Sequence, residues 1–233
     1  MPIGQTLTAA AYFVGAVAFW MAARQRKLAT EGVAYLAMAA FVGGVLGAKM
    51  GEWALGNGAL WGQQPLAVLE PQLGGRTILG GVLGGWIAVA VAKKRLGIRR
   101  STGDLFAFAL PWGEAVGRIG CWFNGCCFGA LWDGPCAVWQ HEAWRIPTQF
   151  LSALTAVGIG IIIWSRRGQR REGEAWHLYL ALWGVGRFVI EFGRDHPFGA
   201  DILSPAQWIA LVISAYGIMR LRRDRPPIIG ATA

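Results

Sequence analysis

The segment QTLTAAAYFVGAVAFWMAARQRK, residues 5–27, joins a long apolar stretch to a short basic one. Residues 5–23 carry no charged side chain, and their number is close to the roughly 20 residues that a helix needs to cross a bilayer core. Arg24, Arg26 and Lys27 follow at once. A secretory signal peptide has the reverse order, with its basic region first. The segment therefore predicts a membrane-spanning helix whose C-terminal end lies in the cytoplasm.

The rest of the chain has the same apolar character. Of its 233 residues, 55% are hydrophobic and only 15% are charged, whereas about a quarter of the residues in a soluble domain are charged. Seven stretches are apolar enough to form spans, at about 5–23, 31–50, 77–92, 104–123, 148–165, 174–192 and 204–220. We therefore predict an all-α integral membrane protein, with residues 1–233 forming a single domain of seven transmembrane helices.

The basic residues predict the orientation of these helices. With the N-terminus outside and the C-terminus cytoplasmic, 16 of the 22 Lys and Arg residues fall in cytoplasmic segments, namely 24–30, 93–102, 166–173 and the tail from 220. Cytoplasmic loops of membrane proteins carry this excess of positive charge. The net charge of +9 is then the positive charge of the cytoplasmic segments, which lie near anionic lipid head groups. It requires no nucleic-acid partner.

Two long outer loops are predicted at about 51–76 and 124–147. Both are rich in Gly, Pro and Trp, a residue that prefers the membrane interface. They either form a cap over a cavity on the outer membrane surface or serve as simple connectors with aromatic anchors. Their tryptophans are Trp53, Trp61, Trp132, Trp139 and Trp144.

Ionisable residues recur at helical spacing near the outer ends of two predicted spans. Glu114 and Arg118 are four residues apart, and Arg187, Glu191 and Arg194 lie at i, i+4 and i+7, so each set is expected on one helix face. One interpretation is that the pairs only hold the helices together. The other is a binding site, because three arginines exceed the charge of two glutamates, and arginine suits the geometry of a phosphate.

The stretch GRIGCWFNGCCFG, residues 117–129, contains three of the four cysteines. The spacings of Cys121, Cys126, Cys127 and Cys136 do not match the paired C-x₂₋₄-C pattern of zinc sites, and His141 alone adds little. A disulfide from Cys136 to Cys126 or Cys127 in an oxidising compartment, small thiols that pack helices, and a thiolate activated by Arg118 are the open alternatives.

The same stretch resembles the G-R-x-G-N-F-x-N-G-E-x-x-G signature of the prolipoprotein diacylglyceryl transferase family. GVGRFVIEFGRDHP (184–197) is similar to that family's R-F-x-x-E-F-x-R-x-P-D motif. Weaker similarities occur in VGGVLGAKMG (42–51), GRTILGGVLGG (75–85) and IPTQF (146–150). The order of the motifs and the seven-span topology agree with the family along nearly the whole chain.

The resemblance implies an enzyme of the bacterial inner membrane, with its active site toward the outer face. Such an enzyme takes phosphatidylglycerol and transfers the diacylglyceryl group to the thiol of the lipobox cysteine in a prolipoprotein signal peptide, and glycerol 1-phosphate leaves. The resemblance implies neither a metal nor another cofactor. We expect catalytic roles for Arg118, Arg187 and Glu191. Substrate binding is expected of Asn124, Arg194, Glu114, Cys121 and Cys126.

Several positions depart from the family pattern. Leu79 stands in place of the family histidine, Cys121 in place of an asparagine and Cys126 in place of a glutamate, while Thr8, Ala9 and Ala10 replace an early Trp-Tyr-Gly stretch. Glu191, Glu114 and His196 are the candidate replacement bases. The departures favour either a different acceptor or a non-catalytic phospholipid-binding protein, and a thiol-redox protein that uses Cys126, Cys127 and Cys136 is the third alternative.

Overall fold

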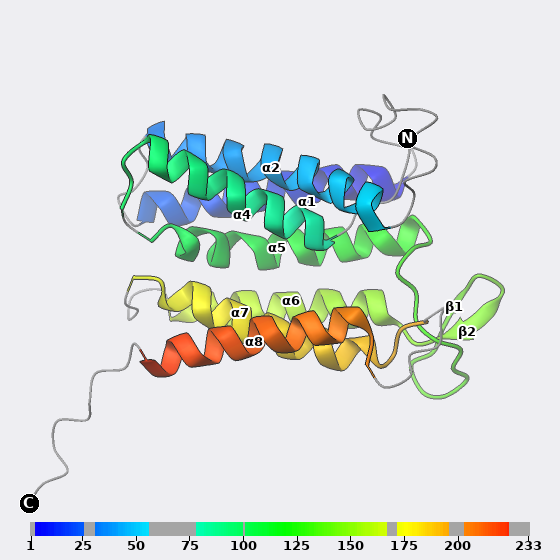
Figure 1. Cartoon of the computed structure of the whole chain (residues 1–233). Helices are drawn as coiled ribbons and strands as arrows, with labels where there is room; N and C mark the ends of the chain where they lie inside the picture. Colours follow the sequence, from blue (N-terminus) through cyan, green and yellow to red (C-terminus); the bar gives the residue numbers. More distant parts are fainter. Residues whose placement is uncertain are drawn as a thin grey trace, which may run out of the picture. The chain divides into compact units, whose positions relative to one another are not determined.

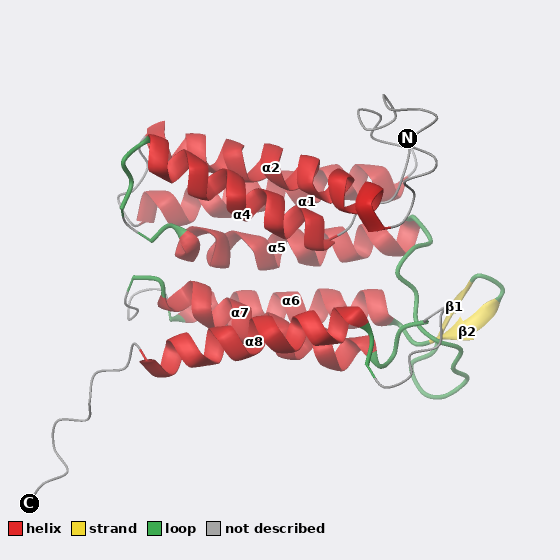
Figure 2. Cartoon of the chain, viewed as in Figure 1, coloured by secondary structure: helices red, strands yellow, loops and turns green. Residues whose placement is uncertain are grey.

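The computed structural model describes residues 3–25, 31–55, 78–99, 101–166, 172–195 and 203–223. Within these ranges the chain forms seven helices and one short β-hairpin (Figures 1 and 2). The helices are α1 (Ile3–Gln25), α2 (Glu31–Leu55), α4 (Ile78–Arg95), α5 (Gly103–Phe123), α6 (Thr148–Ser165), α7 (Glu174–Glu191) and α8 (Pro205–Arg223), and the strands are β1 (Val138–Gln140) and β2 (Ala143–Arg145). Each of the seven predicted stretches falls on one of these helices.

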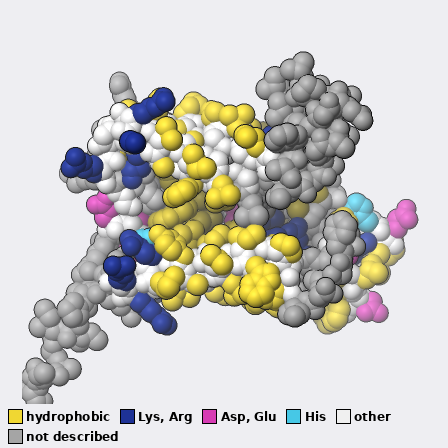
Figure 3. All heavy atoms as spheres, in the orientation of Figure 1, with side chains coloured by type: hydrophobic (Ala, Val, Ile, Leu, Met, Phe, Trp, Pro, Cys, Tyr) yellow, Lys and Arg dark blue, Asp and Glu magenta, His cyan; other side chains and the backbone are white. Residues whose placement is uncertain are grey.

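The surfaces of the helices are apolar, as expected of a protein that is solvated by lipid. Three helical segments within the described ranges, Ile3–Gln25, Gly32–Gly51 and Thr148–Ser165, are long and apolar enough to cross a membrane. Large apolar side chains are exposed on several helices, for example Phe13 with 70% of its surface and Leu154 with 68%. In the space-filling view, hydrophobic side chains dominate the visible helix surfaces, and Lys and Arg gather near helix ends (Figure 3).

The chain divides into two compact units, and residues 23–100 form the smaller one. In this unit α2 packs along α4 through glycines on both helices. A Cβ atom at Gly43 would lie 2.6 Å from the carbonyl oxygen of Gly84, and one at Gly84 would lie 2.8 Å from the Cα atom of Gly47. Only glycine permits such a close approach of two backbones, which explains the glycines at these positions. α2 extends to Leu55, so the predicted loop at 51–76 begins later than expected, and its residues 56–76 lie outside the described ranges.

The larger unit contains residues 1–22 and 101–233. Here α5 packs on α6, α6 and α5 both contact α7, and α7 packs on α8. The start of α7 is held by Asp104 from the first turn of α5. Its completely buried carboxylate accepts hydrogen bonds from the backbone N–H groups of Gly173 (2.9 Å) and Trp176 (3.0 Å). This contact sets the position of α7 along α5. It thereby also sets how the ionisable residues of the two helices are aligned along the helix axes.

The segment between α5 and α6 has a structure of its own. β1 and β2 pair antiparallel, and the backbone N–H of Ala130 donates to the carbonyl oxygen of Gly193, just after α7, at 2.9 Å. Arg145 forms an ion pair with Asp195 at 2.9 Å, donates to the carbonyl oxygen of Gly129 and lies 4.6 Å from the ring centre of Phe128. These contacts give Arg145 a structural role. The hairpin was not predicted, because its strands are only three residues long.

Candidate active site

The first part of the site is on α5. Arg118, of which only 7% is exposed, forms an ion pair with Glu114 one turn earlier, with Nη2 and Oε1 3.0 Å apart. The other carboxylate oxygen of Glu114 accepts a hydrogen bond from the indole N–H of Trp183 on α7, at 2.9 Å. Glu114 therefore fixes the position of Arg118 and links the two helices. The predicted pairing at i and i+4 is confirmed.

The second part is at the C-terminal end of α7. Nη2 of Arg187 lies 2.8 Å from Oε2 of Glu191, and Nη1 of Arg194 lies 3.7 Å from the same oxygen. The hydroxyl of Ser204 donates to the other oxygen of Glu191 at 3.4 Å. The spacing predicted that Arg194 and Arg187 share a helix face. This prediction is wrong, because α7 ends at Glu191. Arg194 reaches Glu191 from the turn that follows, where its backbone pairs with Gly129.

A pocket of about 270 Å³ lies between α5, α6 and α7. Glu114, Arg118 and Arg187 line it together with Trp183, and α6 contributes Ser152. The remaining lining residues are Thr155, Ala156, Ile159, Gly186 and Ile190. The tertiary structure thus brings Arg118 and Arg187 to one cavity, although they are far apart in the sequence.

The polar residues that α6 contributes were missed in the sequence. Ser152 and Thr155 line the pocket. With Thr148 they stand at i, i+4 and i+7, and therefore on one face of a largely apolar helix. This polar stripe is the signal that could have identified them. Ser152 donates its hydroxyl to the carbonyl oxygen of Thr148 at 2.7 Å, so its oxygen can still accept a hydrogen bond from a ligand.

Among the described residues, the charged side chains near the pocket include more arginines than glutamates. Arg118, Arg187 and Arg194 together carry one more positive charge than Glu114 and Glu191 compensate. Arg187 is close enough to both other arginines to be repelled by them. Such a group of buried cations is unfavourable by itself, and it is stabilised by a bound anion. The arrangement therefore suits a phosphate group that reaches the pocket from a lipid.

Asn124 follows α5 directly, as its C-cap residue. Its side-chain amide donates to the hydroxyl of Thr8 in α1 at 3.5 Å, and its backbone nitrogen would lie 2.9 Å from a Cβ atom at Gly4. Asn124 therefore contacts the first turns of α1 and is not among the residues that line the pocket. Its assignment to substrate binding remains a prediction.

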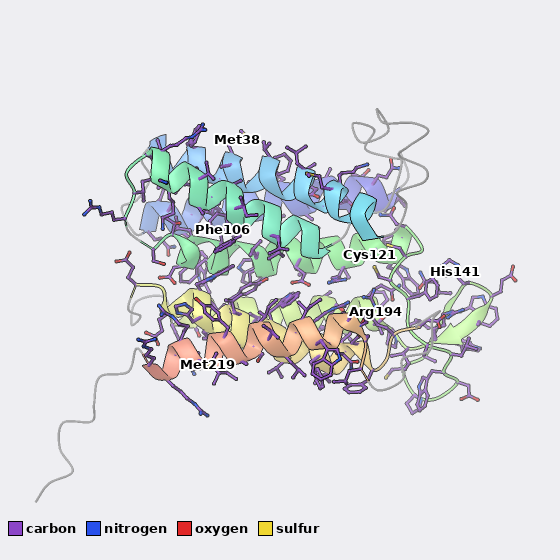
Figure 4. All side chains as sticks on the ribbon, in the orientation of Figure 1. Met38, Phe106, Cys121, His141, Arg194 and Met219 are labelled. Atoms are coloured by element: carbon purple, nitrogen blue, oxygen red, sulfur yellow. The ribbon has the colours of Figure 1, made fainter. Side chains whose placement is uncertain are left out.

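The thiol sulfurs of Cys121, Cys126 and Cys127 all lie within 4.8 Å of one another. Cys121 lies at the end of α5 that leads into the hairpin segment (Figure 4). The chain reverses there through two residues with positive φ, Gly125 (64°) and Cys127 (60°). All four cysteines are free thiols, so the disulfide from Cys136 that the sequence left open is not formed, and Cys136 does not belong to the cluster.

Two side chains from the start of α6 hold this turn in place. The amide of Gln149 donates to the carbonyl oxygen of Cys126 at 3.0 Å, and the hydroxyl of Thr148 donates to that of Cys127 at 2.9 Å. Both side chains are almost completely buried. They belong to IPTQF (146–150), one of the weaker similarities to the family. Their role is visible only in the folded chain.

The three thiols are not equivalent. Hydrogen bonds from the thiols of Cys121 and Cys126 lower the pKa of Cys127 below its ordinary value, and the positive charges of Arg194 and Arg118 act in the same direction. The hydrogen bond between Cys126 and Cys121 raises the pKa of Cys126 instead.

The remaining residues are two positions that depart from the family pattern and the three candidate bases. Leu79, in place of the family histidine, belongs to the first turn of α4. Thr8 is in α1, where its hydroxyl donates to the carbonyl oxygen of Gly4 at 2.9 Å. His196, one of the candidate bases, lies outside the described residues. The other two candidates, Glu114 and Glu191, are both engaged in ion pairs.

Apolar helices, and a pocket lined by two arginines between three of them, are the features of a helical membrane protein whose site suits an anionic ligand. The model of the prolipoprotein diacylglyceryl transferase family matches residues 5–222. The chain belongs to this family and is a membrane transferase.

Several curated relatives are similar over most of their length. The phosphatidylglycerol–prolipoprotein diacylglyceryl transferase of Symbiobacterium thermophilum is 30% identical, over 88% of this chain and 83% of its own. The enzyme of the same name from Polynucleobacter asymbioticus is 31% identical, over 81% of this chain and 76% of its own. Transferase 2 of Clostridium perfringens is 26% identical, over 76% and 73%. The resemblance found in the sequence is thereby confirmed at the level of the family.

Proposed function

We propose that the protein transfers the diacylglyceryl group of phosphatidylglycerol to an acceptor, which is either the thiol of a prolipoprotein cysteine or, because of the departures from the family motifs, another nucleophile. The observation that carries the proposal is the placement of Arg118 and Arg187 in one pocket, with Arg194 close by. The relatives named above act on phosphatidylglycerol and prolipoprotein, which supports these substrates for the present chain.

The lining of the pocket suits a lipid head group, because it combines two arginines with the hydroxyls of Ser152 and Thr155. The phosphate would be bound by the arginines. The hydroxyls of the glycerol would find partners in Ser152 and Thr155, and the acyl chains would remain among the apolar helix surfaces. We therefore place only the polar part of the substrate in the pocket.

The proposed reaction is a displacement at carbon. With a thiol acceptor, the sulfur loses its proton to a base and forms a bond to the glyceryl carbon that bears the phosphate. The bond between this carbon and the phosphate oxygen breaks, the electron pair stays on the oxygen, and glycerol 1-phosphate leaves. Arg118 and Arg187 stabilise the charge that grows on the leaving phosphate. Glu191, Glu114 and His196 are the candidates for the base.

We further propose that the hairpin segment 124–147 forms a cap on the outer membrane surface. The segment is attached to the turn after α7 through Ala130 and Gly193, and Trp139 and Trp144 expose more than half of their surfaces. Aromatic side chains of this kind favour the membrane interface. The site would then open toward the outer face of the bacterial inner membrane, where a secreted prolipoprotein is accessible.

The second candidate function is phospholipid binding without catalysis. The observation in its favour is Leu79, because an aliphatic side chain cannot take up the proton that the family histidine could. The ion pairs of Glu114 and Glu191 also give both candidate bases a second role as charge partners. A protein that kept the phosphate site and lost the chemistry would have these features.

One assay separates the candidates. The purified chain is mixed with labelled phosphatidylglycerol and a lipobox peptide, and released glycerol phosphate and lipidated peptide are measured. Release together with lipidation supports the prolipoprotein reaction, and release without lipidation identifies a different acceptor. If neither product forms while lipid still binds in a manner that depends on Arg187, the protein is a binder. Absence of both turnover and lipid binding would contradict the proposal.

A further inference from the structure

Cys121, Cys126 and Cys127 converge although their spacing in the sequence argued against a metal site. Paired cysteines along the chain are not required for such a site here, because the turn after α5 folds the chain back on itself. Three sulfurs within 4.8 Å of one another are close to the separation of about 4 Å that follows from metal–sulfur bonds of about 2.3 Å. Only a small adjustment of the side chains would bring all three sulfurs to a common ion.

The turn is held in the conformation that makes this convergence possible. Cys127 has a positive φ of 60°, which is unfavourable by about 1–2 kcal/mol for a residue with a Cβ atom. The hydrogen bonds from Thr148 and Gln149 fix the carbonyl groups of Cys127 and Cys126. The backbone N–H of Cys126 also donates to the carbonyl oxygen of Cys121 at 3.1 Å. The sulfurs are thus positioned by the fold before any ligand binds.

The surroundings favour a negatively charged complex. Three thiolates around a monovalent or divalent cation leave a net charge of −2 or −1. Arg118 and Arg194 are close enough to Cys127 to act on its charge, and they would compensate this excess. Among the described residues, Oε1 of the almost completely buried Gln149 finds no hydrogen-bond partner. A water molecule bound to the metal as a further ligand would supply a donor beside this residue.

A vicinal disulfide is a poor alternative for Cys126 and Cys127. Adjacent Cα atoms are about 3.8 Å apart across a trans peptide bond, and the described residues contain no cis peptide bond. Disulfides usually join Cα atoms about 4.4–6.8 Å apart. A bond from Cys121 to either residue is free of this restriction, and the experiment therefore tests for it directly.

We propose that Cys121, Cys126 and Cys127 bind a soft, thiophilic metal ion, of the class of Zn²⁺ or Cu⁺, at the end of α5. Sulfur ligands select these ions over Mg²⁺ or Ca²⁺. On binding, each thiol releases its proton to solvent as its sulfur–metal bond forms. The ion would fix the end of α5 only three residues after Arg118. The proposal does not depend on the transferase reaction, because none of the three cysteines lines the pocket.

The test uses the full chain in detergent, reduced, treated with a chelator and kept free of oxygen. Co²⁺ is added as the probe. We expect a sulfur-to-cobalt charge-transfer absorption that saturates at one ion per chain and is removed by Zn²⁺, and a separate titration with Cu⁺ shows which ion binds more tightly. Cys136→Ser is the matched control and should bind as the wild type does. Cys121→Ser, Cys126→Ser and Cys127→Ser should each lose more than the roughly 10–100-fold in affinity that removal of an outer-shell partner costs.

A second measurement covers variants that fail to fold. Zn²⁺ should protect three thiols of the wild-type chain from alkylation and leave Cys136 reactive, as counted by mass spectrometry. The proposal is overturned if no charge-transfer band forms, if one of the three variants binds as the wild type does, or if Cys136→Ser binds as weakly as they do. A disulfide within the cluster, in chains whose thiols were trapped in intact membranes, would overturn it as well. None of these results depends on turnover, so they do not bear on the proposed transferase function.

Discussion

At the scale of single residues, Arg118 and Arg187 supply the positive charge in the lining of the pocket. Each is paired with a glutamate on its own helix, and each lines the same cavity. A guanidinium group can bind an anion through two parallel hydrogen bonds while it keeps its ion pair, whereas a lysine ammonium cannot reproduce this geometry. The arrangement makes these arginines the most sensitive positions for the proposed reaction.

We expect Arg118→Ala and Arg187→Ala each to reduce turnover of phosphatidylglycerol at least about 10²-fold, because each removes a charged donor from the leaving phosphate. Arg187→Lys should recover only part of this loss. Glycerol phosphate release is the measurement, and thermal unfolding in detergent checks that the variants are folded. Arg166→Ala, at an exposed arginine after α6, is the control. Wild-type turnover in both alanine variants would show that the site is assigned wrongly.

At the scale of elements, the alignment of α5 and α7 depends on few contacts. Asp104 binds the first N–H groups of α7, where a carboxylate also interacts favourably with the helix dipole. At the other end of α7, Glu191 binds Arg187 and Arg194. Between these ends, Trp183 donates to Glu114. The position of Arg187 relative to Arg118 follows from this series of contacts.

Asp104→Ala should lower the free energy of unfolding by about 1–3 kcal/mol, since it removes the acceptor of the buried N–H of Gly173 and of the part-buried N–H of Trp176 at the start of α7. Asp104→Asn keeps one acceptor oxygen and should have a smaller effect. The midpoint of thermal unfolding in detergent measures both changes. Asp133→Ala removes an exposed acidic group from the hairpin segment and serves as the control. Equal midpoints for all three variants would refute the capping role of Asp104.

Two glycines make a matched pair for testing helix packing. A Cβ atom at Gly184 on α7 would lie 2.6 Å from the carbonyl oxygen of Ala210 and 2.7 Å from the Cβ atom of Ser214 on α8, whereas one at Gly158 on α6 would have nothing within 4 Å. Gly184→Ala should therefore destabilise the fold by about 1–3 kcal/mol through overpacking. Gly158→Ala should stabilise it by about 0.5–1 kcal/mol through helix propensity. Equal unfolding temperatures for the two variants would contradict the close packing of α7 on α8.

At the scale of the whole molecule, the distribution of basic residues predicts which ends of the helices face the cytoplasm. α4 ends with Lys93, Lys94 and Arg95, and α8 ends with Arg220, Arg222 and Arg223. The hairpin segment would then lie on the outer side, as the proposed function requires. The orientation can be tested without an assay of activity.

Cys136, which is exposed, should react with a membrane-impermeant maleimide in intact spheroplasts when the other three cysteines are replaced by serine. In a chain that lacks all four native cysteines, the Arg166→Cys variant should react only after the membrane is permeabilised. Positive charge retained in the cytoplasm is the physical reason for this difference. The reverse labelling pattern would show that the topology is the opposite of the predicted one. The pocket would then face the side of the membrane that a secreted acceptor does not reach.

The sequence by itself determined the helices, the family and the two Glu–Arg pairs. These features depend on residues that are close along the chain, because a run of about 20 apolar residues forms a helix in lipid and residues four apart share a helix face. The pairing of Arg118 with Glu114 and of Arg187 with Glu191 follows from that rule. The rule does not extend to Arg194, because α7 ends before this residue.

Only the tertiary structure decided which of these residues meet. Arg118 and Arg187 share a pocket because α5 and α7 pack together. α6 adds a polar stripe that was not predicted. The cysteines show the difference most clearly. Their spacing argued against a metal, but the distances between sulfurs depend on a turn with positive φ and on Thr148 and Gln149, which lie more than 20 residues away. Contacts of this kind become visible only when the chain is folded.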